Sequence, residues 1–218
     1  MKIQSESNES IEPTEPKKMK IHTDKNEANS TLSFIGVVVS AFVLALILTN
    51  FVFQKFDVVG SSMYPTVHDK DVILVNKLPV TKSKLNNKTY IPQRGDIIVF
   101  ESPLSYGSSK EKSLIKRVIA LPGEKVSLKS GKITVYNNEH PSGFDPDSAY
   151  KENLPYTDGD IDSLTVPEGH IFVSGDNRTS GESLDSRNSL GTVPLKNIIG
   201  EAWLRIYPFS DSKNFYKN

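Results

Sequence analysis

Ser62 and Lys116 are the two residues of this chain best suited to covalent chemistry. A serine hydroxyl is a weak nucleophile, so a nearby base must remove its proton. A lysine amine can act as that base only when it is neutral, and burial favours the neutral form because desolvation disfavours the ammonium ion. The ordinary pKa of lysine is ~10.4, so the site must lower it by several units.

Ser62 begins the segment Ser62-Met63-Tyr64-Pro65-Thr66. The proline fixes its own backbone φ angle and stiffens the turn that presents the serine. Two residues before the serine, Gly60 permits a close backbone approach or an unusual backbone angle. An isolated Ser-x-x-Pro sequence is usually an ordinary turn, so its assignment as a nucleophile depends on the other motifs.

Lys116 lies in an apolar run that favours a β-strand. Alternate residues of a strand share a face, so we expect Lys116 to point with Leu114 and Val118 and to be partly buried. Arg117 then points to the opposite face and can pair elsewhere. A lone lysine in such a run is more often a surface residue whose ammonium reaches solvent.

Other catalytic chemistries have little support. The absence of cysteine excludes disulfides, thiol catalysis and cysteine-bound metals. Four histidines are present, none in a nucleophile or base motif: His22, His68, His140 and His170. No metal-ligand spacing or phosphate loop occurs, so we expect no metal and no cofactor. Basic and acidic residues balance at 26 each, which gives no indication of a nucleic-acid partner.

An uncharged apolar run covers residues 32–53 and precedes the candidate serine. As a helix it would be about 33 Å long, enough to cross the ~30 Å hydrocarbon core of a membrane. A buried core helix rarely lacks a polar stripe over this length, and a cleaved signal peptide has a shorter apolar region with a small-residue cleavage site. We therefore expect one transmembrane helix.

The flanking charges predict the orientation of this helix. Lys17, Lys18, Lys20 and Lys25 precede the run, whereas Lys55 alone follows it closely. Because basic residues favour the cytoplasmic side, we expect a cytoplasmic N-terminus and an extracytoplasmic domain over 54–218. Residues 1–31 are polar and are expected to form a disordered tail.

The segment from residue 56 onward is expected to form a mainly antiparallel β domain with no amphipathic helix of ordinary length. Short β-branched runs are separated by Gly- and Pro-containing turns. The expected strands are 56–59, 71–76, 96–100, 114–121, 132–136, 170–174 and 202–206. Residues 79–93 are expected to be a polar insert, and 137–166 an inserted loop region.

Four ordered motifs resemble those of bacterial type I signal peptidases, in the single-anchor Gram-positive form. They are Ser62-Met63-Tyr64-Pro65-Thr66, Arg94-Gly95-Asp96-Ile97-Ile98-Val99-Phe100, Lys116-Arg117-Val118-Ile119-Ala120-Leu121-Pro122-Gly123-Glu124, and Gly175-Asp176-Asn177-Arg178 with Asp185-Ser186-Arg187. The resemblance covers roughly residues 32–208, including the apolar run. Each motif alone is weak, but four in order behind a membrane anchor are specific.

The resemblance implies a role for each candidate. Ser62 would attack the scissile carbonyl, Lys116 would be the general base, and the backbone N–H of Ser62 would help to form the oxyanion hole. Gly60 stands where some relatives carry a hydroxyl that supplies a second donor. Four charged residues would hold the last motif through charge-assisted hydrogen bonds. They are Asp176, Arg178, Asp185 and Arg187.

A serine in the last motif would orient the lysine amine, but the spacing here departs from the family pattern. Four residues separate Arg178 from Ser183, where the family usually has two. Counting back from Asp185 selects Ser183, which we prefer because Ser-x-Asp-Ser-Arg is intact. Ser180 remains an alternative, and the two extra residues are expected to bulge at the loop tip.

The resemblance carried by these motifs implies a membrane-bound serine endopeptidase that cleaves N-terminal signal peptides from exported preproteins. The resemblance implies a substrate that is extended, with small residues one and three positions before the cut. Membrane lipid is a further expected partner through Phe51, Phe53, Phe56 and Tyr64, which could equally be core residues. The alternatives are a serine–lysine protease with a narrow substrate set and a catalytically silent, anchored β-rich binding module.

Overall fold

The computed structural model describes residues 25–104, 113–149, 154, 156–179, 183–212 and 214–215. The chain divides into two compact units, one ending at Val43 and one beginning at Leu44. Most of the expected disordered tail, residues 1–24, lies outside the described residues.

The apolar run is helical. Helix α1 (Lys25–Ile47) continues into a π-helical turn over Leu48–Val52. The part from Leu32 to Val52 is long and apolar enough to cross a membrane, and its side chains are not buried against the protein. This helix is consistent with a membrane anchor. The expected boundary at residue 53 is one residue too late, because Phe53 begins strand β1.

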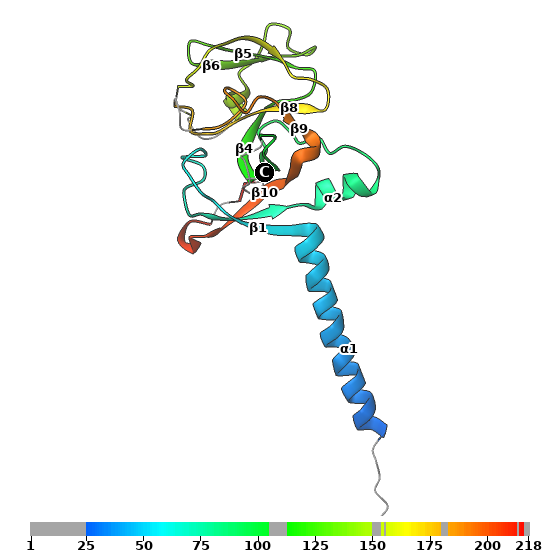
Figure 1. Ribbon diagram of the computed structural model, residues 1–218. Helices are drawn as coiled ribbons and strands as arrows, with labels where there is room; N and C mark the ends of the chain where they lie inside the picture. The colour runs from blue at the N-terminus through cyan, green and yellow to red at the C-terminus, as the bar shows by residue number, and fades with distance from the viewer. Residues whose placement is uncertain are drawn as a thin grey trace, which may run out of the picture. The chain divides into compact units, whose positions relative to one another are not determined.

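The second unit contains a seven-stranded sheet in the order β1-β2-β10-β3-β4-β8-β9, and its strand pairs are antiparallel (Figure 1). The strands are β1 (Phe53–Asp57), β2 (Val72–Asn76), β3 (Ile97–Glu101), β4 (Ser113–Ala120), β8 (His170–Ser174), β9 (Val193–Pro194) and β10 (Ile198–Tyr207). The mainly antiparallel β class is confirmed.

A second, three-stranded sheet has the order β6-β5-β7. Its strands are β5 (Lys125–Lys129), β6 (Lys132–Tyr136) and β7 (Ile161–Thr165). The expectation that 137–166 is only loop is wrong, because this region supplies β7 and the 3₁₀ turn Pro146–Ala149. The sequence signal of β7 is weak because exposed Asp162 and Ser163 interrupt its two half-buried apolar residues.

The expected polar insert 79–93 contains helix α2 (Leu78–Leu85), which has eight residues. Pro79 lies in its first turn, where the missing N–H costs no hydrogen bond. Val80 is buried and belongs to the core. The helix is too short for a clear helical period, so the polar composition of the segment concealed it.

Strand β4 connects the apolar clusters of the second unit. Val118 packs in a cluster with Ile98 and Phe100 of β3. Its neighbour Ile119 packs instead with Val126 and other residues of the three-stranded sheet. β4 therefore carries the candidate lysine on a strand that is fixed by apolar packing on both of its faces.

Candidate active site

The structure brings Lys116 and Ser62 together. The Nζ atom of Lys116 lies 2.7 Å from Oγ of Ser62 and also donates to the backbone carbonyl of Ile115 at 2.7 Å. Lys116 is 2% exposed, so the expected burial is found. Register places Lys116 opposite Ile98 of β3, and Leu114 packs with the same apolar cluster as Ile98. Such an environment disfavours the charged form of an amine.

Ser62 lies in a closed loop between β1 and β2. Val58 N–H donates to the Asp71 carbonyl at 2.8 Å, and Lys70 N–H donates to the Val58 carbonyl at 2.9 Å, so the loop ends are paired. Within the loop, Met63 is 1% exposed and packs in the core beneath the serine. The buried methionine and the paired ends hold the serine in place.

Gly60 has a φ angle of +98°, which explains why a glycine stands there. Its N–H donates to Oδ1 of Asp69 at 2.8 Å. A Cβ atom at this position would meet nothing within 4 Å, so backbone conformation rather than crowding selects glycine. Asp69 could not be identified from the sequence, because an aspartate in a polar turn carries no spacing signal.

The loop after β8 contacts the backbone around the serine. Asn177 N–H donates to the Ser62 carbonyl at 3.0 Å, and the Asn177 side chain donates to the Ser61 carbonyl at 3.3 Å. Gly175 packs so closely that a Cβ atom there would lie 2.3 Å from both the Ser62 carbonyl oxygen and Ser183 Oγ. Glycine is therefore required at this position, because any side chain would clash with these atoms. The close packing also places Ser183 beside the serine loop.

Ser183 is buried, and its hydroxyl donates to Oδ2 of Asp185 at 2.7 Å. A hydroxyl has one donor hydrogen and two lone pairs, so this bond leaves Ser183 able to accept a hydrogen bond from an amine. The alternative orienting serine, Ser180, lies outside the described residues.

Asp176 joins the serine loop, β4 and the last motif. It is fully buried and accepts hydrogen bonds from Nε and Nη2 of Arg117, at 2.8 and 2.5 Å. Thr66 of the serine loop donates to the same carboxylate at 2.5 Å. Arg117, which the strand pattern placed on the face opposite that of Lys116, therefore pairs with Asp176.

Arg178 is fully buried beneath the same loop. Its guanidinium binds both carboxylate oxygens of Asp147, at 2.7 and 2.8 Å, and its Nε donates to the Gly175 carbonyl at 2.8 Å. Such paired contacts suit the planar guanidinium. Asp147 comes from the region expected to be only loop, and no local pattern linked it to Arg178.

Asp185 is a fully buried carboxylate that contacts several donors. Arg187 binds it through Nε and Nη2, and Gly175 N–H donates to it at 2.8 Å. Burial alone would raise the pKa of Asp185, but the hydrogen bonds and charge of Arg187, with the donors of Gly175 and Ser183, outweigh it and hold the pKa below its usual range.

The described histidines have contacts elsewhere. His68 Nδ1 lies 3.2 Å from Nη1 of the buried Arg205, and His140 packs edge-on against Phe144. His170 Nδ1 lies 3.2 Å from the Glu168 carbonyl. Among the described parts of the chain, no group of three or more His, Asp or Glu residues could hold a metal ion.

Known proteins are similar in sequence to most of this chain. Residues 31–207 match the family described as "Signal peptidase, peptidase S26". Signal peptidase I T of Bacillus subtilis (strain 168) is 32% identical over 194 residues, covering 88% of this chain and 93% of the relative. Signal peptidase I P of Bacillus subtilis subsp. natto is 35% identical over 188 residues, covering 85% and 93%. The chain therefore belongs to the signal peptidase family, peptidase S26, as a serine endopeptidase that cleaves signal peptides.

Proposed function

We propose that Ser62 is the nucleophile and Lys116 the general base of signal-peptide cleavage. The observation that carries this proposal is the 2.7 Å separation of Lys116 Nζ and Ser62 Oγ at a buried position. A neutral Lys116 amine takes the hydroxyl proton as Oγ bonds to the scissile carbonyl carbon. The resulting ammonium returns that proton to the leaving amine as the C–N bond breaks. Water then hydrolyses the acyl ester, with Lys116 again as base.

The developing negative charge on the carbonyl oxygen requires a preorganised donor, which we assign to the backbone N–H of Ser62. Gly60 supplies no side-chain donor, and its own N–H already donates to Asp69. Stabilisation of the oxyanion therefore depends on backbone geometry, and the packing of Met63 supports that geometry.

Ser183 is proposed to orient the Lys116 amine by accepting one of its hydrogens. Its hydroxyl hydrogen goes to Asp185, which leaves the lone pairs for the amine. Ser183→Ala should lower kcat well below that of Ser180→Ala, measured on the same precursor. Equal losses, or the greater loss in Ser180→Ala, would overturn this assignment.

The proposed substrate segment is extended and binds as an added strand beside Ser62, with small residues one and three positions before the cut. Residues 32–52 are proposed to cross the cytoplasmic membrane, with the N-terminus inside and the protease domain outside. A membrane-impermeant thiol reagent tests this topology on Ser163→Cys, because the natural chain has no cysteine. Labelling of intact cells is expected, and labelling only after lysis would contradict the topology.

Cleavage of a purified secretory precursor by the full-length protein tests the catalytic pair. The comparison includes wild type, Ser62→Ala, Lys116→Ala and the control Ser61→Ala, whose side chain is exposed beside the nucleophile. Both pair variants should lose activity while remaining folded, and the control should retain it. Near-normal cleavage by Lys116→Ala would place the base elsewhere.

A further inference from the structure

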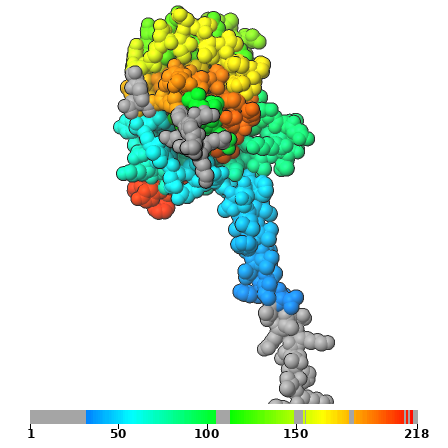
Figure 2. All heavy atoms as spheres, viewed as in Figure 1, coloured from blue at the N-terminus to red at the C-terminus, as the bar shows by residue number. Residues whose placement is uncertain are grey.

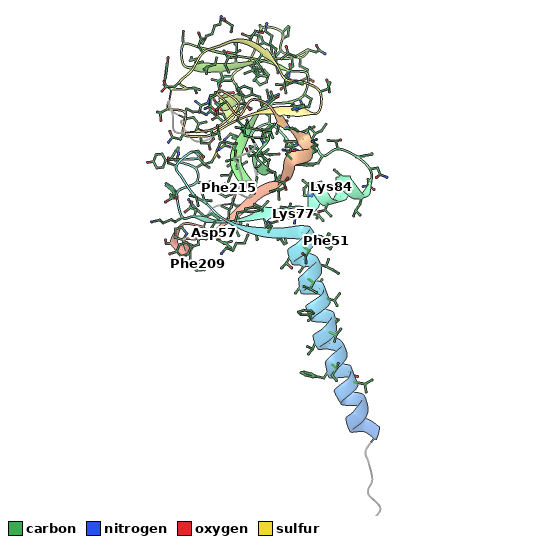
Figure 3. All side chains as sticks on the ribbon, viewed as in Figure 1. Phe51, Asp57, Lys77, Lys84, Phe209 and Phe215 are labelled. Carbon is green, nitrogen blue, oxygen red and sulfur yellow. The ribbon has the colours of Figure 1, made fainter. Side chains whose placement is uncertain are left out.

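Helix α2 is attached to the end of the apolar helix. Lys77, directly before α2, donates through its N–H to the Val52 carbonyl at 2.7 Å and through Nζ to the Asn50 carbonyl at 2.9 Å. Thr81 of α2 donates to the Phe51 carbonyl at 2.9 Å. The last carbonyls of a helix have no hydrogen-bond donor within that helix, and here Lys77 and Thr81 provide the donors. Figure 3 shows Phe51, Lys77 and Lys84 at this junction.

The surface around α2 combines basic and apolar side chains. Residues 77–93 contain four lysines and no acidic residue. Three of these lysines are exposed: Lys82, Lys84 and Lys88. Beside them Leu85 is 80% exposed, and Leu78 and Phe51 are about half exposed at 49% and 55%. Figure 2 shows this segment, in blue-green, protruding from the rest of its unit.

A protruding surface of this composition has two ordinary explanations, a solvated turn and an interfacial contact. Leucine side chains among lysines, at the end of an apolar helix of membrane-spanning length, favour the second. The 21 residues from Leu32 to Val52 would extend about 32 Å, so Val52 would reach the headgroup region of the bilayer. The hydrogen bonds to Val52 and Phe51 hold α2 at that depth.

We propose that α2, with Phe51 and Lys88, is a contact with the bilayer surface that binds anionic phospholipid headgroups. The leucines and Phe51 insert among the upper acyl chains, while the lysines pair with the phosphates of anionic lipid. This inference rests on the proposed membrane anchorage of residues 32–52. It goes beyond anchorage because it assigns a second attachment, which prevents the protease domain from tilting freely about one helix.

The proposed lipid contact is connected to strand β4, which carries Lys116, through apolar packing. Val80 of α2 is buried in the same apolar cluster as Val118 of β4 and Ile98 of β3. Lys116 lies opposite Ile98 in the strand register. A lipid-bound α2 would therefore fix the height of the catalytic strand above the membrane surface, where a signal peptide emerges from the bilayer.

Fluorescent labelling at single introduced cysteines tests the proposal in the full-length protein. Leu85→Cys and the control Ser163→Cys, an exposed residue of β7, each provide the only thiol because the natural chain has none. Each labelled protein is placed in nanodiscs of phosphatidylcholine, with or without phosphatidylglycerol, that contain brominated acyl chains as quenchers. The Leu85→Cys label should be quenched and blue-shifted, more strongly with phosphatidylglycerol, and the control label should show neither effect.

A second variant tests the contribution of the lysine charges to lipid binding. Lys82→Gln, Lys84→Gln and Lys88→Gln combined in the Leu85→Cys protein should remove the added quenching with phosphatidylglycerol, with folding checked by circular dichroism. Quenching that is absent at Leu85→Cys in both lipids would overturn the proposal, and quenching that is insensitive to phosphatidylglycerol would overturn its anionic-lipid part. Precursor cleavage by wild type in the same nanodiscs tests the catalytic proposal separately.

Discussion

The two sheets of the second unit differ in what they bury. The three-stranded sheet packs a cluster of aliphatic and aromatic side chains, among them Val126, Leu128 and Phe172 of the adjoining β8. The seven-stranded sheet and its loops bury ionised groups as well, including Asp176, which pairs with Arg117 on β4. Burying charge is costly unless each ion is paired and hydrogen-bonded. Several of these ionised groups lie on β4 and in the loop after β8, beside the candidate nucleophile, whereas the cluster of the three-stranded sheet is apolar.

Strand β4 contacts both regions, because residues along it face different parts of the second unit. Lys116 contacts Ser62, the candidate nucleophile, and Arg117 pairs with Asp176 in the loop after β8. Farther along the same strand, Ile119 packs into the cluster of the three-stranded sheet. We therefore expect changes in the loop after β8 to reduce activity first, and changes in the three-stranded sheet to reduce stability first.

The largest effect is expected from Gly175→Ala. The new methyl group would lie 2.3 Å from the Ser62 carbonyl oxygen, which is backbone and cannot move without displacing Ser62, the proposed nucleophile. Precursor cleavage should fall to a small fraction of wild type, mainly through kcat. Gly36→Ala is the control, because a Cβ there meets nothing within 4 Å. Near-wild-type kcat in Gly175→Ala would show that the loop is less constrained than its contacts indicate.

Asp176→Ala should destabilise the folded protein by ~3–5 kcal/mol, since it leaves the buried Arg117 guanidinium without this carboxylate. The loss of its hydrogen bond to Thr66 should also loosen the serine loop, so activity should fall with stability. Denaturant unfolding measured together with kcat tests this coupling. Lost stability with unchanged kcat in the folded fraction would show that the ion pair stabilises the fold without supporting the candidate active site.

Leu128→Ala should show the opposite behaviour. Leu128 is fully buried in the three-stranded sheet, and truncation of such a side chain costs ~2–5 kcal/mol. Because the cluster lies outside the serine loop, kcat of the folded protein should remain close to wild type. A kcat loss as large as that of Asp176→Ala would contradict the division between the two sheets.

The smallest effect is expected on the acid side of the pH range. The pKa values of Asp185 and Glu124 are both lowered in the fold: burial raises each, but Arg187 and Arg94 respectively, with further donors, outweigh it. A lowered folded pKa gives stability that is present above the unfolded value of about 4 and is lost as pH falls through the folded value. Stability should therefore decline below about pH 4, and less steeply in Glu124→Gln. An equal slope in that variant would contradict this linkage.

Much of the architecture could be predicted from the alternation of apolar and polar residues and from the Gly- and Pro-containing turns. Six of the seven expected strands correspond to strands of the structure, since each has an apolar run between Gly, Pro or polar residues. The expected strand 56–59 is displaced: β1 covers Phe53–Asp57, and the β-branched Val58 and Val59 lie in the loop after it. β5 and β7 were missed because their exposed Lys, Asp and Ser residues leave few apolar positions. α2 was missed because a helix of eight residues shows barely two turns of periodicity.

The sequence also predicted that Ser62 and Lys116 would approach one another, but not how they are held. Ser62, Lys116 and Ser183 carry the motif signal, and the first two are in contact. The partners Asp147 and Asp69 could not have been found, because contacts such as Asp147 with Arg178 join segments far apart in sequence. Such pairings depend on the tertiary fold rather than on local spacing.

Chemical rescue of the lysine is a direct test of Lys116 as the base for Ser62. Lys116→Cys provides the only thiol of the chain, and aminoethylation in the unfolded state restores an amine at nearly the length of lysine. Wild type taken through the same treatment and refolding is the control. We expect Lys116→Cys to be inactive, aminoethylation to restore precursor cleavage, and alkylation with a neutral amide not to restore it. Equal activity after the two treatments, or substantial activity in unmodified Lys116→Cys, would contradict Lys116 as the base for Ser62.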